Sequence, residues 1–401
     1  MANHANTPSK TPQPMSVKVA VAVIHYQDHY LLGFRNSSQH QGNRYEFVGG
    51  KIDTAEAPIA ALIREVDEET GIDISHNTKV KLGRLHHDYG DKKVSLHVYK
   101  IALTAEQYQQ HQHQDKGLEG QTLTWVTQHA LLAGDYLLPA ANRTILTWLQ
   151  IPEQIAITYP LAHFSQYDNP AAAWLKFYQQ HIPSITSGTW VYLRIKSSDL
   201  SNAAPQPDES DMVKSLITSR PDIGTIVPCA LQDTSQGNPQ NQQIKAYHLT
   251  QTELMHWFLA HNRFLANNRF LAHNRFLANN SHAANAVNST ASVVPFEAMT
   301  MLSQPLIISC HDTASILAAN KLADARIQQH LPPVIGIFLS PVLSTQTHPD
   351  TVPLGWTAWS SLAQLADMPV IGLGGLSPMM RDKATEHGAS SIAGIRQFLL
   401  C

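Results

Sequence analysis

The segment at residues 50–72, GKIDTAEAPIAALIREVDEETGI, constrains the fold and chemistry of this chain more than any other. It fits the spacing G-x5-E-x7-R-E-U-x-E-E-x-G-U, in which U is a bulky aliphatic residue. The fixed positions are filled by Gly50, Glu56, Arg64, Glu65, Val66, Glu68, Glu69, Gly71 and Ile72. The segment predicts one helix over residues 53–70, because Asp53 with Glu56 resembles a capping box and Gly71 is a typical helix stop.

One face of the predicted helix is acidic. Glu65, Glu68 and Glu69 stand at i, i+3 and i+4, so their carboxylates converge. Each like-charge pair costs roughly 0.2–0.5 kcal/mol even when solvated, and a hard divalent cation removes that cost. The alternative is a solvated acidic face with ion pairs such as Arg64 with Glu68. The set spacing of the two glycines, Glu56 and Arg64 favours a metal site.

Apolar periodicity predicts a sheet on which this helix packs. Strands are predicted at residues 17–25, 30–34 and 94–101, and a second helix at 141–149. The apolar stripe of the first helix, at i, i+3, i+4 and i+7, consists of Ile59, Leu62, Ile63 and Val66.

Length and composition bound the class of protein. A chain of 401 residues predicts two domains, and its net charge of −3 gives no electrostatic footprint for nucleic acid. Any nucleotide it handles is therefore expected to be a free small molecule. Three cysteines without paired spacing indicate a reducing cytoplasm and no structural zinc. Residues 1–15 are polar and Pro-rich, which indicates a disordered tail rather than a signal peptide, and no apolar run is long enough to span a membrane.

The pattern at 50–72 is the signature of the Nudix hydrolases, which cleave nucleoside diphosphates linked to another group, and the chain resembles that family. The resemblance extends to the MutT-type members, which hydrolyse 8-oxo-dGTP and related oxidised nucleotides and so limit mutation. Three further stretches carry it: YEFVGGKID at 45–53, EGQ at 119–121 and PAAN at 139–142. The resemblance implies a Nudix α/β/α sandwich over residues 16–150 and hydrolysis to a nucleoside monophosphate and pyrophosphate. The implied cofactor is Mg²⁺, with Mn²⁺ as the alternative.

The resemblance also implies which residues form the site. The metal would be bound by the Gly49 carbonyl and by Glu65, Glu68, Glu69 and Glu119. Glu65 or Glu119 would be the general base, a choice that the sequence leaves open, and Arg64 belongs to the catalytic set. The nucleotide would contact Arg35, His40, Glu46, Phe47, Val48, Gly49, Lys51 and Asn142. Val48 replaces the proline that is usual in this loop.

Two of the nucleotide-contacting residues have open alternatives. The guanidinium of Arg35 suits a phosphate or a carbonyl oxygen, although alone it would be an ordinary surface charge. The amide of Asn142 both donates and accepts, so it can bind a purine edge, but Asn is also a common helix N-cap.

A second domain is predicted over residues 151–401. Candidate strands lie at 154–158, 189–195, 225–231, 246–249, 306–309, 334–338, 370–372 and 391–393. Eight strands alternating with helices predict a (β/α)8 TIM-type barrel, so the whole chain is α/β.

This half resembles thiamine phosphate synthase in the stretches LRIK at 193–196, SCHD at 309–312, PVLSTQTHP at 341–349, GLGGL at 372–376, GA at 388–389 and IAGIR at 392–396. The resemblance implies a barrel phosphate site formed by Arg194, Lys196, Thr345, Thr347, Gly374 and Gly375, for a thiamine-pathway phosphate. The chain departs from the family at Tyr192, Glu253, Ser344 and His348. These departures predict a degenerate ligand-binding barrel, which could also regulate the Nudix half or act as a scaffold.

Low-complexity insertions are predicted near 202–212, 233–243 and 261–290. Residues 262–279 repeat NRFLAN or NRFLAH with a period of six, which does not form one stripe on a helix. We interpret the repeat as a recent tandem expansion inside a barrel helix or loop, with a partner-binding helix as the alternative. The rival substrates are another nucleoside diphosphate derivative and a thiamine-linked pyrophosphate.

Overall fold

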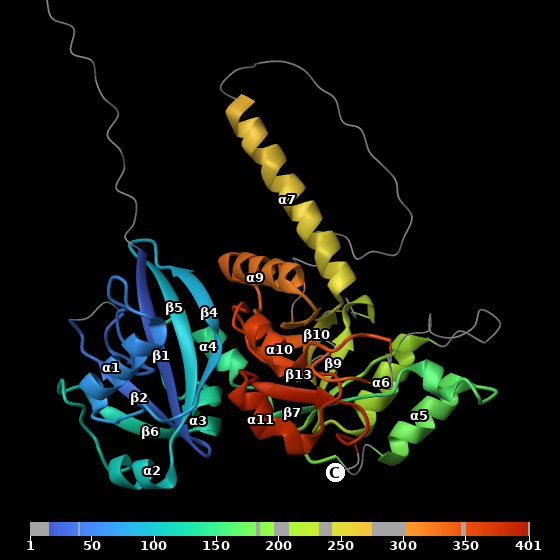
Figure 1. The fold of residues 1–401 in the computed structure, drawn as a ribbon, viewed down its shortest axis with the longest axis horizontal. Coiled ribbons are helices and arrows are strands. Elements are labelled where there is room, and N and C mark those ends of the chain that lie inside the picture. Colours follow the sequence, from blue (N-terminus) through green and yellow to red (C-terminus); the bar gives the residue numbers. More distant parts are fainter. Residues whose placement is uncertain are drawn as a thin grey trace, which may run out of the picture. The chain divides into compact units, whose positions relative to one another are not determined.

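The computed structural model describes residues 16–38, 41–181, 185–195, 208–231, 243–274, 302, 304–345 and 350–399, with side chains up to residue 263 in the helix that ends at 274. The chain divides into two compact units, Met1–Asn77 with Arg84–Gln128, and Thr78–Gly83 with His129–Cys401 (Figure 1). The domain limits expected from the sequence, 16–150 and 151–401, stay a prediction.

The first sheet has the strand order β3-β2-β1-β5-β4, and β6, which lies off this path, pairs antiparallel with β2. Its strands are β1 (Ser16–Tyr26), β2 (His29–Arg35), β3 (Arg44–Glu46), β4 (Lys79–Asp88), β5 (Lys93–Ala102) and β6 (Leu123–Thr127). β1 pairs antiparallel with β2 and parallel with β5, so the sheet is mixed. The three strands predicted at residues 17–25, 30–34 and 94–101 are therefore present, each slightly longer than expected.

The helix of the signature, α1 (Pro58–Thr70), packs on this sheet through Ala61, Leu62 and Val66, all fully buried. The other helices in this part of the chain are α2 (Ala105–His111), α3 (Gln128–Ala133) and α4 (Asn142–Trp148).

The prediction for α1 is wrong at its N-terminus. The helix begins at Pro58 rather than Asp53, with Ala57 as an extended N-cap that makes no side-chain cap. Proline favours the first helical position because its missing N–H would have no partner there, and Ala55 in the left-handed region (φ 66°) interrupts a helix before it. Ile59 is 45% exposed and does not join the predicted apolar stripe, since it falls in the first turn.

The second sheet is a closed parallel barrel of eight strands, in which β14 pairs with β7. The strands are β7 (Gln154–Ile157), β8 (Trp190–Tyr192), β9 (Gly224–Pro228), β10 (Ile244–Leu249), β11 (Leu306–Cys310), β12 (Val334–Leu339), β13 (Val370–Leu373) and β14 (Ser391–Gly394). The helices between them are α5 (Pro170–His181), α6 (Glu209–Ser219), α7 (Gln251–Asn274), α9 (Thr313–Gln328), α10 (Gly355–Ala363) and α11 (Arg381–Glu386) (Figure 1). All eight predicted strands are present, and the TIM-type fold is confirmed.

The six-residue repeat enters α7, which continues to Asn274, and the remainder of the repeat lies outside the described residues. The insertion predicted near 233–243 also lies almost wholly outside them, and the one near 202–212 overlaps the start of α6. No helix among the described residues is long and apolar enough to cross a bilayer.

Candidate active site

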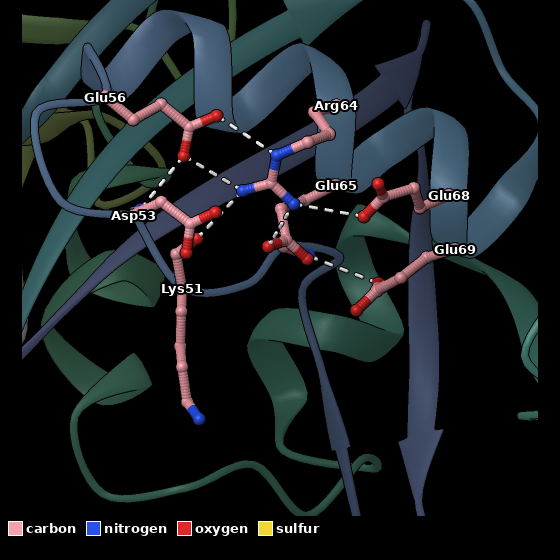
Figure 2. Close-up of polar contacts among 8 residues, drawn as sticks. Lys51, Asp53, Glu56, Arg64, Glu65, Glu68 and Glu69 are labelled. Atoms are coloured by element: carbon pink, nitrogen blue, oxygen red, sulfur yellow. Dashed lines mark hydrogen bonds and ion pairs between the residues drawn. The ribbon is translucent and has the colours of Figure 1, made fainter.

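The carboxylates of α1 lie beside its buried stripe (Figure 2). Leu62 and Val66 are buried in the core, Glu65 and Glu69 next to them are only partly exposed, and Glu68 is exposed. Gly71 ends the helix in the left-handed conformation, φ 73°, and its N–H donates to the Asp67 carbonyl over 2.8 Å. The predicted helix stop is therefore confirmed, and it fixes how far the acidic face extends.

Arg64 is the central cation of this face (Figure 2). Its Nε and Nη2 donate to the two carboxylate oxygens of Glu56 at 3.0 and 2.9 Å. Its Nη1 donates to Glu65 Oε1 at 2.8 Å and to Glu68 Oε2 at 3.0 Å, and its Nη2 also reaches the Lys51 carbonyl at 3.1 Å. One guanidinium thus holds two acidic side chains of the helix and the loop before it in a fixed geometry.

Glu56 holds Arg64 in place, a contact that the sequence pattern did not reveal. Its carboxylate accepts both Arg64 bonds and the Asp53 N–H at 2.9 Å, so it orients Arg64 instead of joining the acidic face. The hydrogen bonds from Arg64 and Asp53 lower the pKa of Glu56. The spacing of eight residues between Glu56 and Arg64 was the available signal, because the helix itself cannot bring these two together.

The glycine loop approaches the acidic face through backbone alone. The Gly49 N–H donates to Glu69 Oε2 at 3.3 Å, and the Gly50 carbonyl accepts from the Ala20 N–H at 2.9 Å. A Cβ on Gly50 would lie 1.9 Å from Glu65 Oε2. A side chain at Gly50 would therefore displace Glu65, which explains why the pattern requires glycine there.

Glu119 reaches this region because its loop caps the C-terminal end of α1. The Leu118 N–H and Gln121 Nε2 both donate to the Glu69 carbonyl, at 2.9 and 3.1 Å. Gln114 Nε2 donates to the Thr70 carbonyl at 2.9 Å. The last carbonyls of a helix have no partner within it, and these three donors satisfy them. Gln114 and Gln121 were missed as positioning residues, although this general need for donors could have indicated them.

Burial and mutual repulsion make Glu69 a weak acid. Desolvation is the largest cause that raises its pKa, to about 8, and the charges of Glu46, Glu119 and Glu65 raise it further. The hydrogen bond from Gly49 opposes the shift. Burial also raises the pKa of Glu65, against the hydrogen bond and charge of Arg64. The site therefore disfavours its own negative charges, as expected where a bound cation is to compensate them.

The residues present fit a hard divalent cation, because the donors are carboxylate oxygens with no sulfur or imidazole among them. Within the described part of the chain, however, no group of three or more His, Cys, Asp or Glu side chains is gathered closely enough to hold a metal. Glu65 and Glu68 are turned to Arg64, and Glu69 accepts from Gly49. The face therefore supplies oxygen donors, and Arg64 holds two of its three carboxylates, Glu65 and Glu68.

The other predicted nucleotide residues fall around the same loop. Arg35 ends β2 and pairs with Glu46 at the end of β3. Phe47 and Val48 are buried, 3% and 1% exposed, and the Val48 carbonyl accepts from the Ala22 N–H at 2.8 Å. Val48 thus belongs to the core beneath the loop, which gives a physical use for an aliphatic residue in place of proline.

Three further residues were predicted to contact the nucleotide. Lys51 has an exposed side chain, although its carbonyl accepts from Arg64, and His40 lies outside the described residues. Asn142 is buried and is the first residue of α4, and Ala141 at the N-cap position makes no side-chain cap. The alternative of Asn142 as the N-cap is therefore not what the structure shows, and its role as a purine reader stays a prediction.

In the barrel, Arg194 follows β8 and its N–H donates to Thr158 Oγ1 at 2.8 Å. Gly374 and Gly375 follow β13 with φ values of 100° and 69°, and the Gly374 carbonyl accepts from the Leu343 N–H at 3.0 Å. Thr345 is described, whereas Lys196 and Thr347 lie outside the described residues. The barrel phosphate site stays a prediction.

A second polar group in the barrel was not predicted. Tyr192 Oη and His248 Nδ1 are 2.8 Å apart, and His248 Nε2 lies 2.8 Å from Ser309 Oγ. The three residues stand near the carboxyl ends of β8, β10 and β11, where ligands bind in barrels of this kind. Tyr192, one of the departures from the synthase pattern, is thus engaged in a buried network.

A mixed α/β sheet that carries this acidic helix face defines a metal-dependent hydrolase of phosphate anhydrides. Residues 19–148 match the family model of the NUDIX domain, and residues 304–398 match that of thiamine monophosphate synthase. The chain is 27% identical over 135 residues to the 8-oxo-dGTP diphosphatase of Escherichia coli, covering 33% of this chain and 96% of that protein. It is 33% identical over 132 residues to the 8-oxo-dGTP diphosphatase of Haemophilus influenzae, covering 32% and 88%. A CTP pyrophosphohydrolase of E. coli is 31% identical over 105 residues, covering 24% and 71%.

The chain therefore belongs to the Nudix family, with a thiamine-phosphate-synthase-like domain in its C-terminal part. Nudix hydrolases use a divalent metal and act on small phosphate compounds, in agreement with the oxygen donors of α1.

We expect a divalent cation to stabilise the protein more at about pH 8.5 than at about pH 6, because protons compete with the cation for Glu69. The raised pKa means that this carboxyl stabilises the metal-free fold fully below its ordinary pKa of 4.5, and that the contribution is lost as the pH rises through about 8. Melting curves in EDTA and in magnesium chloride at both pH values measure the effect. A larger metal increment at the lower pH would contradict it, and Glu69→Gln should flatten the pH dependence.

Proposed function

We propose that this protein is an Mg²⁺-dependent pyrophosphohydrolase that converts 8-oxo-dGTP and related oxidised purine triphosphates to the monophosphate and pyrophosphate. This activity would remove mutagenic nucleotides from the pool. The observation that most supports this proposal is the acidic face of α1. Arg64 and Glu56 hold this face beside the Gly49–Gly50 loop. The two relatives named 8-oxo-dGTP diphosphatase, of which the chain spans 96% and 88%, support the choice of substrate.

Chemically, the oxygen of a water molecule attacks a phosphorus of the triphosphate, and the bridging P–O bond breaks as the new one forms. Glu65, Glu69 and the Gly49 carbonyl would hold Mg²⁺, with Glu68 and Glu119 beside further ions. When bound, such ions lower the pKa of the water and neutralise charge on the leaving phosphate. Glu65 or Glu119 accepts the proton that the water loses. These carboxylates interact, so they titrate as a group and a pH profile reports the group.

Arg64 acts as a positioning residue in this scheme. Its two bonds to Glu56 fix the guanidinium, and its bonds to Glu65 and Glu68 hold both carboxylates at the acidic face. Because the guanidinium stays charged at every working pH, its charge and hydrogen bond oppose the rise in the pKa of Glu65 that burial causes.

The substrate assignment is tested by comparing kcat/KM for 8-oxo-dGTP, dGTP, CTP, ADP-ribose and thiamine pyrophosphate with the full-length protein. We expect 8-oxo-dGTP to exceed dGTP by at least about tenfold, roughly 1.4 kcal/mol of differential binding in the transition state. A preference for CTP would favour the function of the third relative instead. Equal rates for 8-oxo-dGTP and dGTP would overturn the assignment.

For the barrel we propose a degenerate ligand-binding domain for a thiamine-pathway phosphate. The Tyr192–His248–Ser309 network, with Tyr192 at a departure from the synthase pattern, supports binding without the synthase reaction. Titration calorimetry of the full-length protein with thiazole phosphate tests the proposal. Turnover of thiazole phosphate with the pyrimidine pyrophosphate would show a working synthase, and no heat of binding would leave a scaffold role.

A further inference from the structure

Glu119 lies in a closed turn at residues 117–121. The Gly117 N–H donates to the Gln121 carbonyl at 2.8 Å, and the Gly120 N–H donates to the Gly117 carbonyl at 3.0 Å. Gly120 adopts the left-handed conformation, φ 82°, which lets the chain reverse over so few residues. The position of the Glu119 carboxylate therefore depends on where the whole turn is held.

Two donors of this turn meet at one backbone oxygen of α1, the carbonyl of Glu69. The Leu118 N–H donates to it at 2.9 Å and Gln121 Nε2 at 3.1 Å. The side chain of Glu69 belongs to the acidic face, and the negative charge of Glu119 reaches it, because that charge helps to raise the pKa of Glu69. Glu69 thus supplies one carboxylate to the site and, through its backbone, holds the turn that supplies another.

The side chain of Gln121 is costly to bury for the sake of the fold alone. Its Oε1 is buried, and no residue in the described part of the chain donates a hydrogen bond to it. A buried acceptor without a donor destabilises a folded protein. An apolar side chain of the same length would avoid this cost, but it could not donate to the Glu69 carbonyl. The amide is therefore better explained by the bond that it makes to α1.

Gly117 leaves the space that this bond needs. A Cβ on Gly117 would lie 2.4 Å from Cδ of Gln121 and 2.5 Å from the Glu69 carbonyl oxygen. A side chain at this position would therefore push the Gln121 amide away from α1. The glycine and the amide together hold the turn against the end of the helix.

We propose that Gln121 is a positioning residue that couples the docking of the 117–121 turn to the binding of a divalent cation at the acidic face. This coupling rests on the proposed function and deepens it, since it names the side chain that brings Glu119 to the metal site. Docking and cation binding are then linked in both directions. The bond from Gln121 to the Glu69 carbonyl raises the affinity for the cation, and a bound cation holds the turn to α1.

The test measures the binding of Mn²⁺ to the full-length protein without nucleotide, from the electron paramagnetic resonance signal of the free ion. Gln121→Met keeps the length of the side chain and removes both the donor and the unpaired oxygen. We expect it to bind Mn²⁺ about five- to tenfold more weakly than the wild-type protein, the effect of about one hydrogen bond. Its melting temperature in EDTA should change little, because removal of the unpaired oxygen offsets the lost bond. Gly117→Ala should weaken Mn²⁺ binding in the same way.

A double variant separates this coupling from a general disturbance of the site. Glu119→Gln should also weaken Mn²⁺ binding, and Gln121→Met with Glu119→Gln should bind no more weakly than Glu119→Gln alone, because both act through one carboxylate. Hydrogen exchange of the peptide that contains Leu118 should slow when Mg²⁺ is added to the wild-type protein, and less so in Gln121→Met.

Gln107→Met is the matched control, because Gln107 Nε2 also donates to a backbone carbonyl, that of Asp73, at 2.8 Å. It should lower the melting temperature and leave the Mn²⁺ affinity unchanged. Wild-type Mn²⁺ affinity in Gln121→Met, losses that add in the double variant, or a wild-type protein that binds no Mn²⁺ would each overturn the proposed coupling. Failure of the proposed function is visible separately, as a protein that binds Mn²⁺ as expected but does not prefer 8-oxo-dGTP.

Discussion

Glu69→Gln is expected to lower kcat for nucleotide hydrolysis by roughly 10²–10³-fold, the scale at which one electrostatic group contributes in an active site. Glu69 is the most strongly perturbed carboxyl of the acidic face, and the amide loses the charge that a cation requires. The amide oxygen can still accept the Gly49 N–H, so the loop should stay in place. Steady-state kinetics at saturating magnesium measure the loss.

The same variant should fold at least as well as the wild-type protein in EDTA. The carboxylate of Glu69 is disfavoured by burial and by three neighbouring acids, and the amide removes that cost. Asp67→Asn is the matched control, an exposed acid-to-amide change on the same helix, which should keep full activity. Wild-type turnover in Glu69→Gln, or a loss of activity that merely follows a loss of folded protein, would contradict the metal role of Glu69.

Gly49→Ala is expected to reduce the free energy of unfolding by roughly 2–5 kcal/mol, from backbone strain and overpacking together. Gly49 adopts φ 142°, and a Cβ there would lie 2.1 Å from the carbonyl oxygen of Ala20. Because Ala20 is in the central strand β1, the loop rather than the strand would have to move. Urea unfolding followed by circular dichroism measures the change, and the displaced loop should also reduce activity.

Gly90→Ala is the control that separates the cost of backbone strain from the cost of the steric clash with Ala20. Gly90 also has a positive φ, 90°, but nothing lies within 4 Å of a Cβ built on it. Gly90→Ala should therefore reduce the free energy of unfolding by only about 1 kcal/mol, the usual scale for a side chain in a left-handed conformation. Equal losses at Gly49 and Gly90 would show that the contact with Ala20 is unimportant.

Local pattern was enough to predict most of the fold. Alternation predicted β5, and apolar runs predicted β1, β2 and all eight barrel strands, because both signals follow directly from which residues are buried. It failed at the start of α1, where the Asp53–Glu56 hydrogen bond forms as predicted but belongs to a turn. A capping motif specifies a local hydrogen bond, and Pro58 decides where the helix begins.

The sequence predicted which residues belong to the candidate site, but not which of them contact one another. Spacing on a helix brings Glu65, Glu68 and Glu69 to one face, and that much follows from 3.6 residues per turn. The hydrogen bonds between Glu56 and Arg64, and those between the Glu119 loop and the end of α1, join segments that are distant in the sequence. Such contacts depend on where a loop crosses a helix, which no local periodicity records.

The sequence by itself determined the class of chemistry, since the residue types and intervals of 50–72 specify hard oxygen donors on one helix face beside a glycine loop. Only the tertiary structure decided the partners of those donors: Glu65 and Glu68 accept from Arg64, and Glu69 accepts from the Gly49 N–H. It also decided that Arg35 is paired with Glu46. The physical reason is that the pKa and the partners of a charged side chain depend on the groups around it in space. Its burial and its ion pairs are set by the packing of the whole fold.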